Sequence, residues 1–400
     1  MTVTIYPSSP SGSVSAPPSK SMAHRLLVCA GLARGKSMIR GISFSEDILA
    51  TIDCLKALGA DVGIEGNCAE ITGTDPEGTA CAVLPCRESG STLRFFIPVC
   101  ALSSAETRLI GSDTLMKRPL VVYERLFSER GLQFRQSGNS LSIKGILPPG
   151  EYSFSGNVSS QFASGLLFAL PLLNEDSRIV LIPPVESRPY IDMTISALDD
   201  FGVRASWIND TDIVVSGRQH YMPRDLTVEG DWSNSAFLIA MGIHVTGLDE
   251  RSLQGDRICK EYFAALENGC PVLDISDCPD LGPVLFAYAA LHNGGRFTGT
   301  ERLRIKERDR CTAMQEELAK FGVELRIGAN EVVAGCGIKK PDAALDAHND
   351  HRIAMALSVL CIVTGGTISG AEAVRKSFPD YFEVLKSVGI KVEVDDEMDI

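Results

Sequence analysis

Hydrophobic runs of helical length alternate with short strand-like segments along the whole chain of 400 residues. Six of these runs end at a glycine that a strand-like segment follows. A glycine directly after a helix is typical of a left-handed C-terminal cap, because it has no side chain to clash. The pattern therefore predicts that six helices end at Gly59, Gly131, Gly202, Gly269, Gly322 and Gly389.

A polar residue about 40 positions before each of these glycines starts another apolar run. Serine and aspartate are typical of helix N-caps, where the side chain accepts a hydrogen bond from a backbone N–H. The six starts lie about 70 residues apart, except for an interval of 49 between the fourth and the fifth. This spacing predicts six repeats, each containing two helices and at least two strands. The starts are Ser19, Ser89, Ser159, Asp231, Asp280 and Asp350.

The rhythm of the pattern shifts after the third repeat, which predicts a domain boundary near Thr227 to Gly230. Three repeats on each side give two similar domains of the α/β (α+β) class. The length of the chain also fits two domains of about 200 residues.

Composition narrows the class of protein. Hydrophobic residues make up 44% and charged residues 22%, which is typical of a globular chain. No apolar run approaches the roughly 18 residues of a membrane helix, and Met1 to Pro10 lacks a secretory signal, so we expect a cytoplasmic protein. The 12 cysteines are scattered without a C-x-x-C pair, which indicates buried thiols rather than disulfides or zinc ligands.

The formal net charge of −13 argues against a general surface for nucleic acid or for anionic membranes. A small anion would need a local concentration of arginine and lysine. The N-terminal ends of helices favour anions, and pseudo-symmetric repeats should bring these ends together. With Lys20, Arg25 and Arg352 nearby, this predicts a site for an anionic ligand between the domains.

The densest charged segment runs from Glu301 to Arg310. Alternating charges of this kind are typical of a solvated helix face. The spacing of Lys306, Glu307 and Arg310 nevertheless predicts that they share one face of a helix. A carboxylate between cations is a candidate proton carrier, and Asp280 would supply a second carboxylate for acid–base chemistry.

Two further motifs leave alternatives open. His348 and His351, with Asp350 between them, would fit one helix with a metal site, but we favour a cap by Asp350 and anion binding by His351 and Arg352. Arg118-Pro119 and the segment Arg188-Pro-Tyr190 are each, taken alone, typical of a surface turn.

Taken together, the motifs resemble the enolpyruvyl transferase family, and within it the 5-enolpyruvylshikimate-3-phosphate synthases (3-phosphoshikimate 1-carboxyvinyltransferases). They span nearly the whole chain in the order of the family. They are Lys20-Ser21 with Arg25, Gly90-Ser-Thr-Leu-Arg94, Arg118-Pro119, Ser159-Ser160-Gln161, Ser187-Arg-Pro-Tyr190-Ile-Asp192, Pro279-Asp280, Arg304-Ile-Lys306-Glu307-Arg-Asp-Arg310, Asp350-His351-Arg352 and Lys376-Ser-Phe-Pro-Asp-Tyr-Phe382.

The resemblance implies two domains of three βαβαββ-type units each, with buried helices and an active site in the interdomain cleft, which closes on the substrates. The first domain would span 14–227 and the second 1–13 with 228–400, with hinges near 13–18 and 227–230. It implies transfer of the carboxyvinyl group of phosphoenolpyruvate to the 5-hydroxyl of shikimate 3-phosphate, a step of chorismate and aromatic amino acid synthesis. No metal, organic cofactor, nucleic acid or membrane partner is implied. We expect a monomer and a target of glyphosate.

The resemblance also implies roles for individual residues. The catalytic residues would be Asp280, as the base at the shikimate hydroxyl, with Glu307, Lys20 and His351. Shikimate 3-phosphate would contact Lys20, Ser21, Arg25, Ser159, Ser160, Gln161, Ser187, Tyr190, Asp280 and Lys306. Phosphoenolpyruvate would contact Lys20, Gly90, Arg118, Gln161, Glu307, Arg310, Arg352 and Lys376. The chain departs from many relatives at Glu88 and Arg302, where they carry asparagine, and it keeps Gly90.

Three other interpretations fit parts of the sequence. A UDP-N-acetylglucosamine 1-carboxyvinyltransferase shares the fold and the donor, but many carry a cysteine in the loop that here runs from Gly111 to Arg118 without one. An RNA 3′-phosphate cyclase would need a nucleotide site and a basic track, which the charge of −13 disfavours. A non-catalytic repeat scaffold would not need Lys20, Asp280 and Glu307 to meet.

Overall fold

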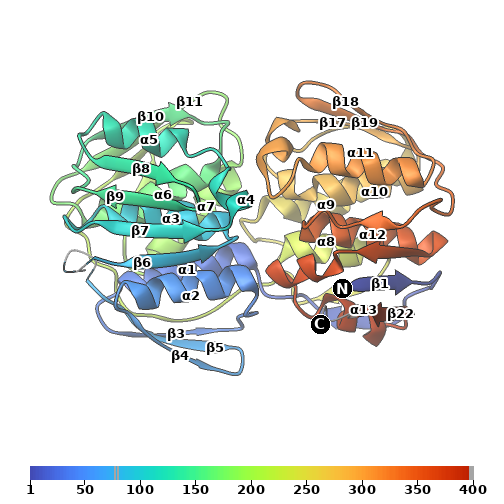
Figure 1. The fold of residues 1–400 in the computed structure, drawn as a ribbon, viewed down its shortest axis with the longest axis horizontal. Helices are drawn as coiled ribbons and strands as arrows, with labels where there is room; N and C mark the ends of the chain where they lie inside the picture. The colour runs from blue at the N-terminus through green and yellow to red at the C-terminus, as the bar shows by residue number, and fades with distance from the viewer. Residues whose placement is uncertain (76–77, 79–80, 396–400) are drawn as a thin grey trace. The chain divides into compact units, whose positions relative to one another are not determined.

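The computed structural model describes residues 1–75, 78 and 81–395. The chain forms two compact units (Figure 1). One unit is the continuous segment Pro18–Glu229, called here the inserted unit. The other, called the terminal unit, combines Met1–Pro17 with the chain from Gly230 onward.

The inserted unit contains three four-stranded sheets that share one topology. In each sheet the first two strands pair in parallel, and the remaining pairs are antiparallel. In spatial order the sheets are β14 (Asp225–Thr227), β3 (Lys36–Arg40), β5 (Cys68–Thr72), β4 (Asp61–Glu65); β6 (Val83–Arg87), β7 (Thr107–Gly111), β9 (Ser140–Lys144), β8 (Gln133–Ser137); and β10 (Glu151–Ser155), β11 (Ser177–Ile182), β13 (Asp212–Val215), β12 (Ala205–Trp207).

The terminal unit repeats this topology twice and adds a parallel two-stranded sheet. Its strands are β16 (Val272–Asp274), β17 (Gly295–Thr298), β19 (Glu331–Ala334), β18 (Leu325–Ile327); β20 (Leu345–Asp346), β21 (Gly366–Ser369), β1 (Thr2–Ile5), β22 (Val392–Asp395); and β15 (His244–Thr246) with β2 (Ser13–Ser15). The described chain thus forms six sheets with their helices, which confirms the predicted repeat and the α/β class.

Helices fill the space between the sheets of each unit (Figure 1). Those of the inserted unit are α1 (Lys20–Leu32), α2 (Glu46–Ala57), α3 (Gly90–Cys100), α4 (Asp113–Met116), α5 (Val121–Ser128), α6 (Ser160–Ala169), the 3-10 turn η2 (Leu170–Leu172) and α7 (Arg188–Asp200). Those of the terminal unit are α8 (Trp232–Ala240), η3 (Gly255–Ile258), α9 (Cys259–Asn268), η4 (Pro279–Leu281), α10 (Gly282–Leu291), η5 (Glu301–Ile305), α11 (Arg310–Lys320), α12 (His351–Thr364), η6 (Ala371–Lys376) and α13 (Tyr381–Ser387).

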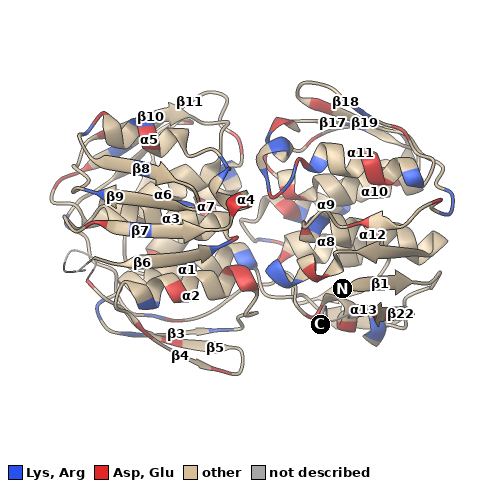
Figure 2. Ribbon diagram, viewed as in Figure 1, with Lys and Arg blue, Asp and Glu red and all other residues tan. Residues whose placement is uncertain are grey.

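Each unit has its own hydrophobic core built around helices that are buried on nearly all sides. Helices α6, α8 and α10 carry no charged side chain (Figure 2). In the inserted unit, Phe95 of α3 meets Phe168 of α6 with their ring centroids 5.1 Å apart. Burying an aromatic or aliphatic side chain stabilises a fold by about 1.5–3 kcal/mol, so these helix bodies hold each unit together.

Five of the six predicted helix starts are N-caps whose side chains accept a hydrogen bond from the following turn: Ser19, Ser89, Ser159, Asp231 and Asp350. The remaining prediction was wrong in detail, because Asp280 lies inside η4, two residues before α10 begins. Polar side chains at these positions satisfy N–H groups that a buried helix start would otherwise leave without partners.

Five of the six predicted C-terminal glycines have positive φ angles between 73° and 100°: Gly59, Gly131, Gly202, Gly322 and Gly389. Gly269 does not follow the prediction. Its φ of 164° is extended backbone, because the chain leaves α9 without a left-handed turn and continues directly toward β16.

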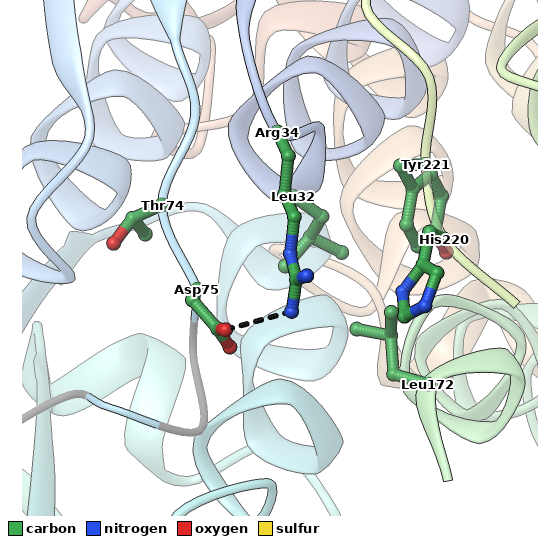
Figure 3. Close-up of a pocket in the computed structure, with 7 residues that line it drawn as sticks. All are labelled: Leu32, Arg34, Thr74, Asp75, Leu172, His220 and Tyr221. Atoms are coloured by element: carbon green, nitrogen blue, oxygen red, sulfur yellow. Dashed lines mark hydrogen bonds and ion pairs between the residues drawn. The ribbon is translucent and has the colours of Figure 1, made fainter. Parts of the chain in front are cut away.

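The inserted unit also has a small pocket beyond the end of α1 (Figure 3). Arg34 pairs with Asp75 across 2.9 Å at this pocket. Its lining is Leu32, Arg34, Thr74, Asp75, Leu172, His220 and Tyr221, none of which is a predicted site residue.

Over the described ranges, the helices are too short or too polar for any to cross a membrane.

Candidate functional site

Hydrogen bonds join the starts of α1, α2 and α3 in the inserted unit. Lys20, the first residue of α1, donates to the carboxylate of Asp47 at the start of α2 over 2.9 Å. The hydroxyl of Thr92 in α3 donates to the backbone carbonyl of Asp47 and to the capping hydroxyl of Ser89, over 3.5 and 2.7 Å. Three helix ends, each favouring negative charge, therefore lie beside the ammonium of Lys20.

The start of α3 is crowded by two guanidinium groups. A β-carbon on Gly90 would lie 2.8 Å from Nη1 of Arg118 and 3.1 Å from Nη1 of Arg94. Arg94 donates to the amide oxygen of Gln161 over 2.8 Å, and the amide nitrogen of Gln161 donates to Ser91 over 2.9 Å. Gln161, at the start of α6, is therefore held in one orientation beside both arginines.

A further cation lies deeper in the same unit. Arg25 is buried and donates to the hydroxyl of Thr194 and to the backbone carbonyls of Ser21 and Tyr190, at 2.8, 2.6 and 2.8 Å. Burial lowers its pKa to about 10, although the guanidinium stays charged at neutral pH. This cation fixes Ser21 in α1 relative to the first turn of α7.

Three of the predicted serines lie at helix starts. Ser159 caps α6, and Ser160 is the first residue of that helix. Ser187 precedes α7 in a left-handed conformation with φ 54°, and its side chain is buried. Non-glycine residues in this conformation cost about 1–3 kcal/mol and cluster at functional sites.

In the terminal unit, three cations surround the carboxylate of Asp280. Arg310 and Lys306 lie 2.8 and 3.2 Å from Oδ1, and Arg352 lies 3.1 Å from Oδ2. Burial raises the pKa of Asp280, but the charges of Arg352, Lys306 and Arg310 outweigh burial and hold that pKa well below its usual range. Asp280 is therefore an ionised carboxylate at neutral pH.

Arg310 is the centre of this cluster. Its side chain is only 1% exposed, and besides Asp280 it binds Glu307 over 2.6 Å and Asp350 over 2.8 Å. Burial lowers the pKa of the neighbouring Lys306, and its pairing with Asp280 only partly offsets the effect. The guanidinium of Arg310 is therefore buried among three carboxylates. An anionic ligand would have to compete with these carboxylates for it.

The turn before α12 links the remaining cations. Asp350 caps α12 by accepting from the backbone N–H of Arg352 over 2.8 Å, and the same carboxylate binds Arg310. Lys376 donates to the backbone and side-chain oxygens of Asn349, both over 2.8 Å. Arg352 also donates to Ser233, at the start of α8, over 2.7 Å. Here too, the starts of several helices meet.

The structure corrects two predictions about this region. Lys306 and Glu307 do not share a helix face with Arg310, because η5 ends at Ile305 and α11 begins only at Arg310. They approach Asp280 and Arg310 from the irregular connection between η5 and α11 instead. His348 is not on the helix of His351, since it has a left-handed φ of 51° and α12 begins at His351.

No group of three or more histidine, cysteine, aspartate or glutamate side chains in the described ranges is arranged to hold a metal ion. The His348 side chain instead lies 2.9 Å from Glu317. His351 is buried at the start of α12. This arrangement favours the cap by Asp350 over the metal alternative.

Sequence reasoning missed several contributors. Asp47 and Glu317 gave no signal of these contacts, because Lys20 lies 27 positions from Asp47 and His348 lies 31 positions from Glu317. Arg94 was part of a motif but had no predicted role, although it lies one helical turn after Gly90 and therefore on the same face. Its contact with Gln161 depends on how α3 packs against α6.

Residues 6–385 match the family described as EPSP synthase (3-phosphoshikimate 1-carboxyvinyltransferase). The chain belongs to the EPSP synthase family. It is 38% identical to a 3-phosphoshikimate 1-carboxyvinyltransferase of Clostridium perfringens (strain ATCC 13124), over 97% of this chain and 98% of that protein. It is equally 38% identical to the enzyme of that name from Clostridium kluyveri, over 98% of both chains.

Solved EPSP synthases share the fold. That of Acinetobacter baumannii superposes with a TM-score of 0.79 at 23% identity, over 98% of this chain and 99% of that chain. The EPSP synthase family match favours the shikimate interpretation over the UDP-N-acetylglucosamine alternative and makes this chain a carboxyvinyltransferase.

Proposed function

We propose that this member of the EPSP synthase family transfers the carboxyvinyl group of phosphoenolpyruvate to the 5-hydroxyl of shikimate 3-phosphate and releases phosphate. The observation that carries the proposal is the family match over residues 6–385, together with cations gathered at helix starts in each unit. Both substrates are anions, so their binding requires this charge.

The proposed substrate contacts follow the two clusters of the inserted unit. Ser21, Arg25, Ser159, Ser160, Ser187 and Tyr190 would bind shikimate 3-phosphate, with Lys20 and Gln161 contacting both substrates. Arg118 and the backbone at Gly90 would bind phosphoenolpyruvate, because the lack of a β-carbon at Gly90 lets two guanidinium groups lie close to the start of α3. Guanidinium groups suit phosphate and carboxylate, since they donate two parallel hydrogen bonds.

In the terminal unit, Arg310, Arg352 and Lys376 would bind the anionic groups of phosphoenolpyruvate. In the free protein, Arg310 and Arg352 are held by Asp280, so ligand oxygens must share or replace these ion pairs. A guanidinium that turns toward substrate stabilises the Asp280 carboxylate less. We infer that binding of phosphoenolpyruvate raises the pKa of Asp280 and makes it a stronger base.

The chemistry is an addition followed by an elimination. The hydroxyl oxygen of shikimate 3-phosphate bonds to C2 of phosphoenolpyruvate, its proton passes to Asp280, and the methylene carbon gains a proton. The tetrahedral intermediate then loses a proton from that methyl carbon and expels phosphate. We assign the proton transfer at this carbon to Glu307, with Lys306, Lys20 and His351 stabilising the charges that develop.

The decisive test of the proposed function is the release of phosphate from the two proposed substrates. Purified protein mixed with shikimate 3-phosphate and phosphoenolpyruvate should release inorganic phosphate and form the enolpyruvyl ether. UDP-N-acetylglucosamine in place of shikimate 3-phosphate should give no release above background. Turnover with the UDP-sugar alone would overturn the proposal.

A Gly90→Ala variant should bind phosphoenolpyruvate more weakly. The new methyl group would lie 2.8 Å from Nη1 of Arg118, so that guanidinium must move away from its present position. We expect the KM for phosphoenolpyruvate to rise about tenfold, equivalent to about 1.4 kcal/mol, with little change in the affinity for shikimate 3-phosphate. A Gly63→Ala variant, where a β-carbon meets nothing within 4 Å, is the control. An unchanged KM in Gly90→Ala would contradict the assignment.

Location and assembly remain predictions. All twelve cysteines are free, which supports a reducing compartment such as the cytoplasm. We expect a monomer, and sedimentation at working concentration checks this.

A further inference from the structure

Glu317 is a buried acid that the proposed reaction leaves unused. It lies in α11, and its side chain is 1% exposed. Its carboxylate accepts hydrogen bonds from Lys320 over 2.8 Å, from the backbone N–H of Asp346 over 3.0 Å and from Nε2 of His348 over 2.9 Å. A buried charge with this many donors is a built feature, because an unpaired carboxylate would be costly there.

Two of these three donors, Asp346 and His348, come from one segment, the turn of residues 346–350 that precedes α12. Lys320 links Glu317 to the residues just before this turn, because it also donates to the carbonyl of Ala344 over 2.9 Å. His348 and Asn349 have consecutive left-handed backbone conformations, with φ of 51° and 55°. Such a turn is unfavourable for non-glycine residues unless surrounding contacts impose it.

Helix α11 holds this turn at both ends. Glu317 binds its beginning, at Asp346 and His348, and Arg310 binds its end, at Asp350. Arg310 and Glu317 are seven positions apart, about two helical turns, so they lie along one face of α11. The hydrogen bond from the N–H of His348 to the carboxylate of Asp346, 2.6 Å long, closes the turn internally.

Because α11 holds the turn of residues 346–350, this turn orients the nearby cations. Asn349 accepts two hydrogen bonds from Lys376, and Asp350 binds Arg310 and caps the backbone of Arg352. Three cations that we assign to phosphoenolpyruvate therefore depend on one short, strained segment. The hydrogen bonds of the Glu317 carboxylate agree with this role: burial raises its pKa, but His348, Lys320 and the Asp346 N–H outweigh burial and lower it.

We propose that Glu317 is a positioning residue, which acts through the turn of residues 346–350 to place Arg310, Arg352 and Lys376 for the anionic donor substrate. This inference rests on the proposed function. Glu317 itself does not have to touch a substrate.

The test is Glu317→Gln, which keeps the shape but turns an NH₂ group toward donors. We expect kcat/KM for phosphoenolpyruvate to fall at least tenfold, while the affinity for shikimate 3-phosphate alone stays within about twofold, since most of its proposed ligands are in the inserted unit. The matched control is Glu383→Gln, because Glu383 makes the same i,i+3 pair with Lys386, over 2.7 Å, on an exposed helix face. The control should retain wild-type kinetics.

A second variant keeps the test independent of folding defects. His348→Asn preserves a residue that tolerates the left-handed conformation but is too short to reach Glu317 in the same way. It should lose kcat/KM for phosphoenolpyruvate in the same direction as Glu317→Gln, and by less, because the Lys320 and Asp346 contacts remain. Wild-type kcat/KM in both variants would overturn the proposal, as would equal losses for both substrates.

Hydrogen exchange separates this inference from the proposed function. In Glu317→Gln, amides of residues 345–352 should exchange faster while the rest of the terminal unit keeps its protection. This readout holds even if the wild-type protein releases no phosphate from the proposed substrates, which would overturn only the function. Unchanged exchange in this segment, or a uniform increase across the unit, would reject a positioning role.

Discussion

Replacing Asp280 by asparagine is expected to lower kcat by about 10²- to 10⁴-fold, the range typical of a lost general base. Asparagine keeps the size of the side chain and one oxygen that accepts from Arg310. It has no lone pair basic enough to take the hydroxyl proton. Binding should change much less than turnover, because Arg310, Arg352 and Lys306 all remain in place.

The measurement is the steady-state rate of phosphate release, together with the affinity for shikimate 3-phosphate by calorimetry. Asp342→Asn, at an exposed position of the same unit, serves as the control and should behave as the wild type. Near-native turnover in Asp280→Asn would remove the assigned role. A parallel loss of affinity and turnover would instead indicate that Asp280 mainly organises the cations.

Replacing Arg310 by methionine should destabilise the terminal unit by about 3–5 kcal/mol, the cost typical of breaking a buried ion pair from one side. Methionine fills the space but leaves Asp350, which is fully buried, without its guanidinium partner. Asp280 and Glu307 lose the same cation. We expect turnover to be lost as well, since this arginine is assigned to phosphoenolpyruvate.

Urea unfolding, followed by a probe in the terminal unit, measures the stability change. Arg310→Lys keeps the charge without the planar fork, so its loss of stability should be smaller while the KM for phosphoenolpyruvate still rises. Arg326→Met breaks an exposed pair with Glu324 and should have no measurable effect on stability. An Arg310→Met protein as stable as the wild type would show that the three carboxylates do not depend on this cation.

The sixfold repeat was predictable because it depends on local signals. Ser19, Ser89 and Asp350 cap helices through contacts with residues two or three positions away, which any reader of the chain can anticipate. The resemblance named further residues, such as Gly90, whose surroundings the structure then supplied. Periodicity alone would not have singled out that glycine.

Predictions failed where the backbone departs from regular structure. Lys306 and Glu307 carry a helical spacing, but no helix forms between Ile305 and Arg310; ion pairs in an irregular segment bring Lys306 to Asp280 and Glu307 to Arg310. His348 looked like part of α12, yet its left-handed conformation is imposed by contacts with Glu317, 31 positions earlier. Such long-range pairs leave no periodic trace in the sequence.

The position of β1 has a consequence for how the protein is made. This strand precedes all the other described strands in the chain, and it lies between β21 and β22, with Val3 opposite both Ile368 and Val394. The inserted unit is complete once residue 229 has left the ribosome, and it contains every strand that its sheets need. Strand β1, in contrast, has neither of its partner strands until almost all of the described chain has emerged. The order of synthesis and the order of folding are thus opposed, because β1 takes its place in the sheet only after β21 and β22 have been made.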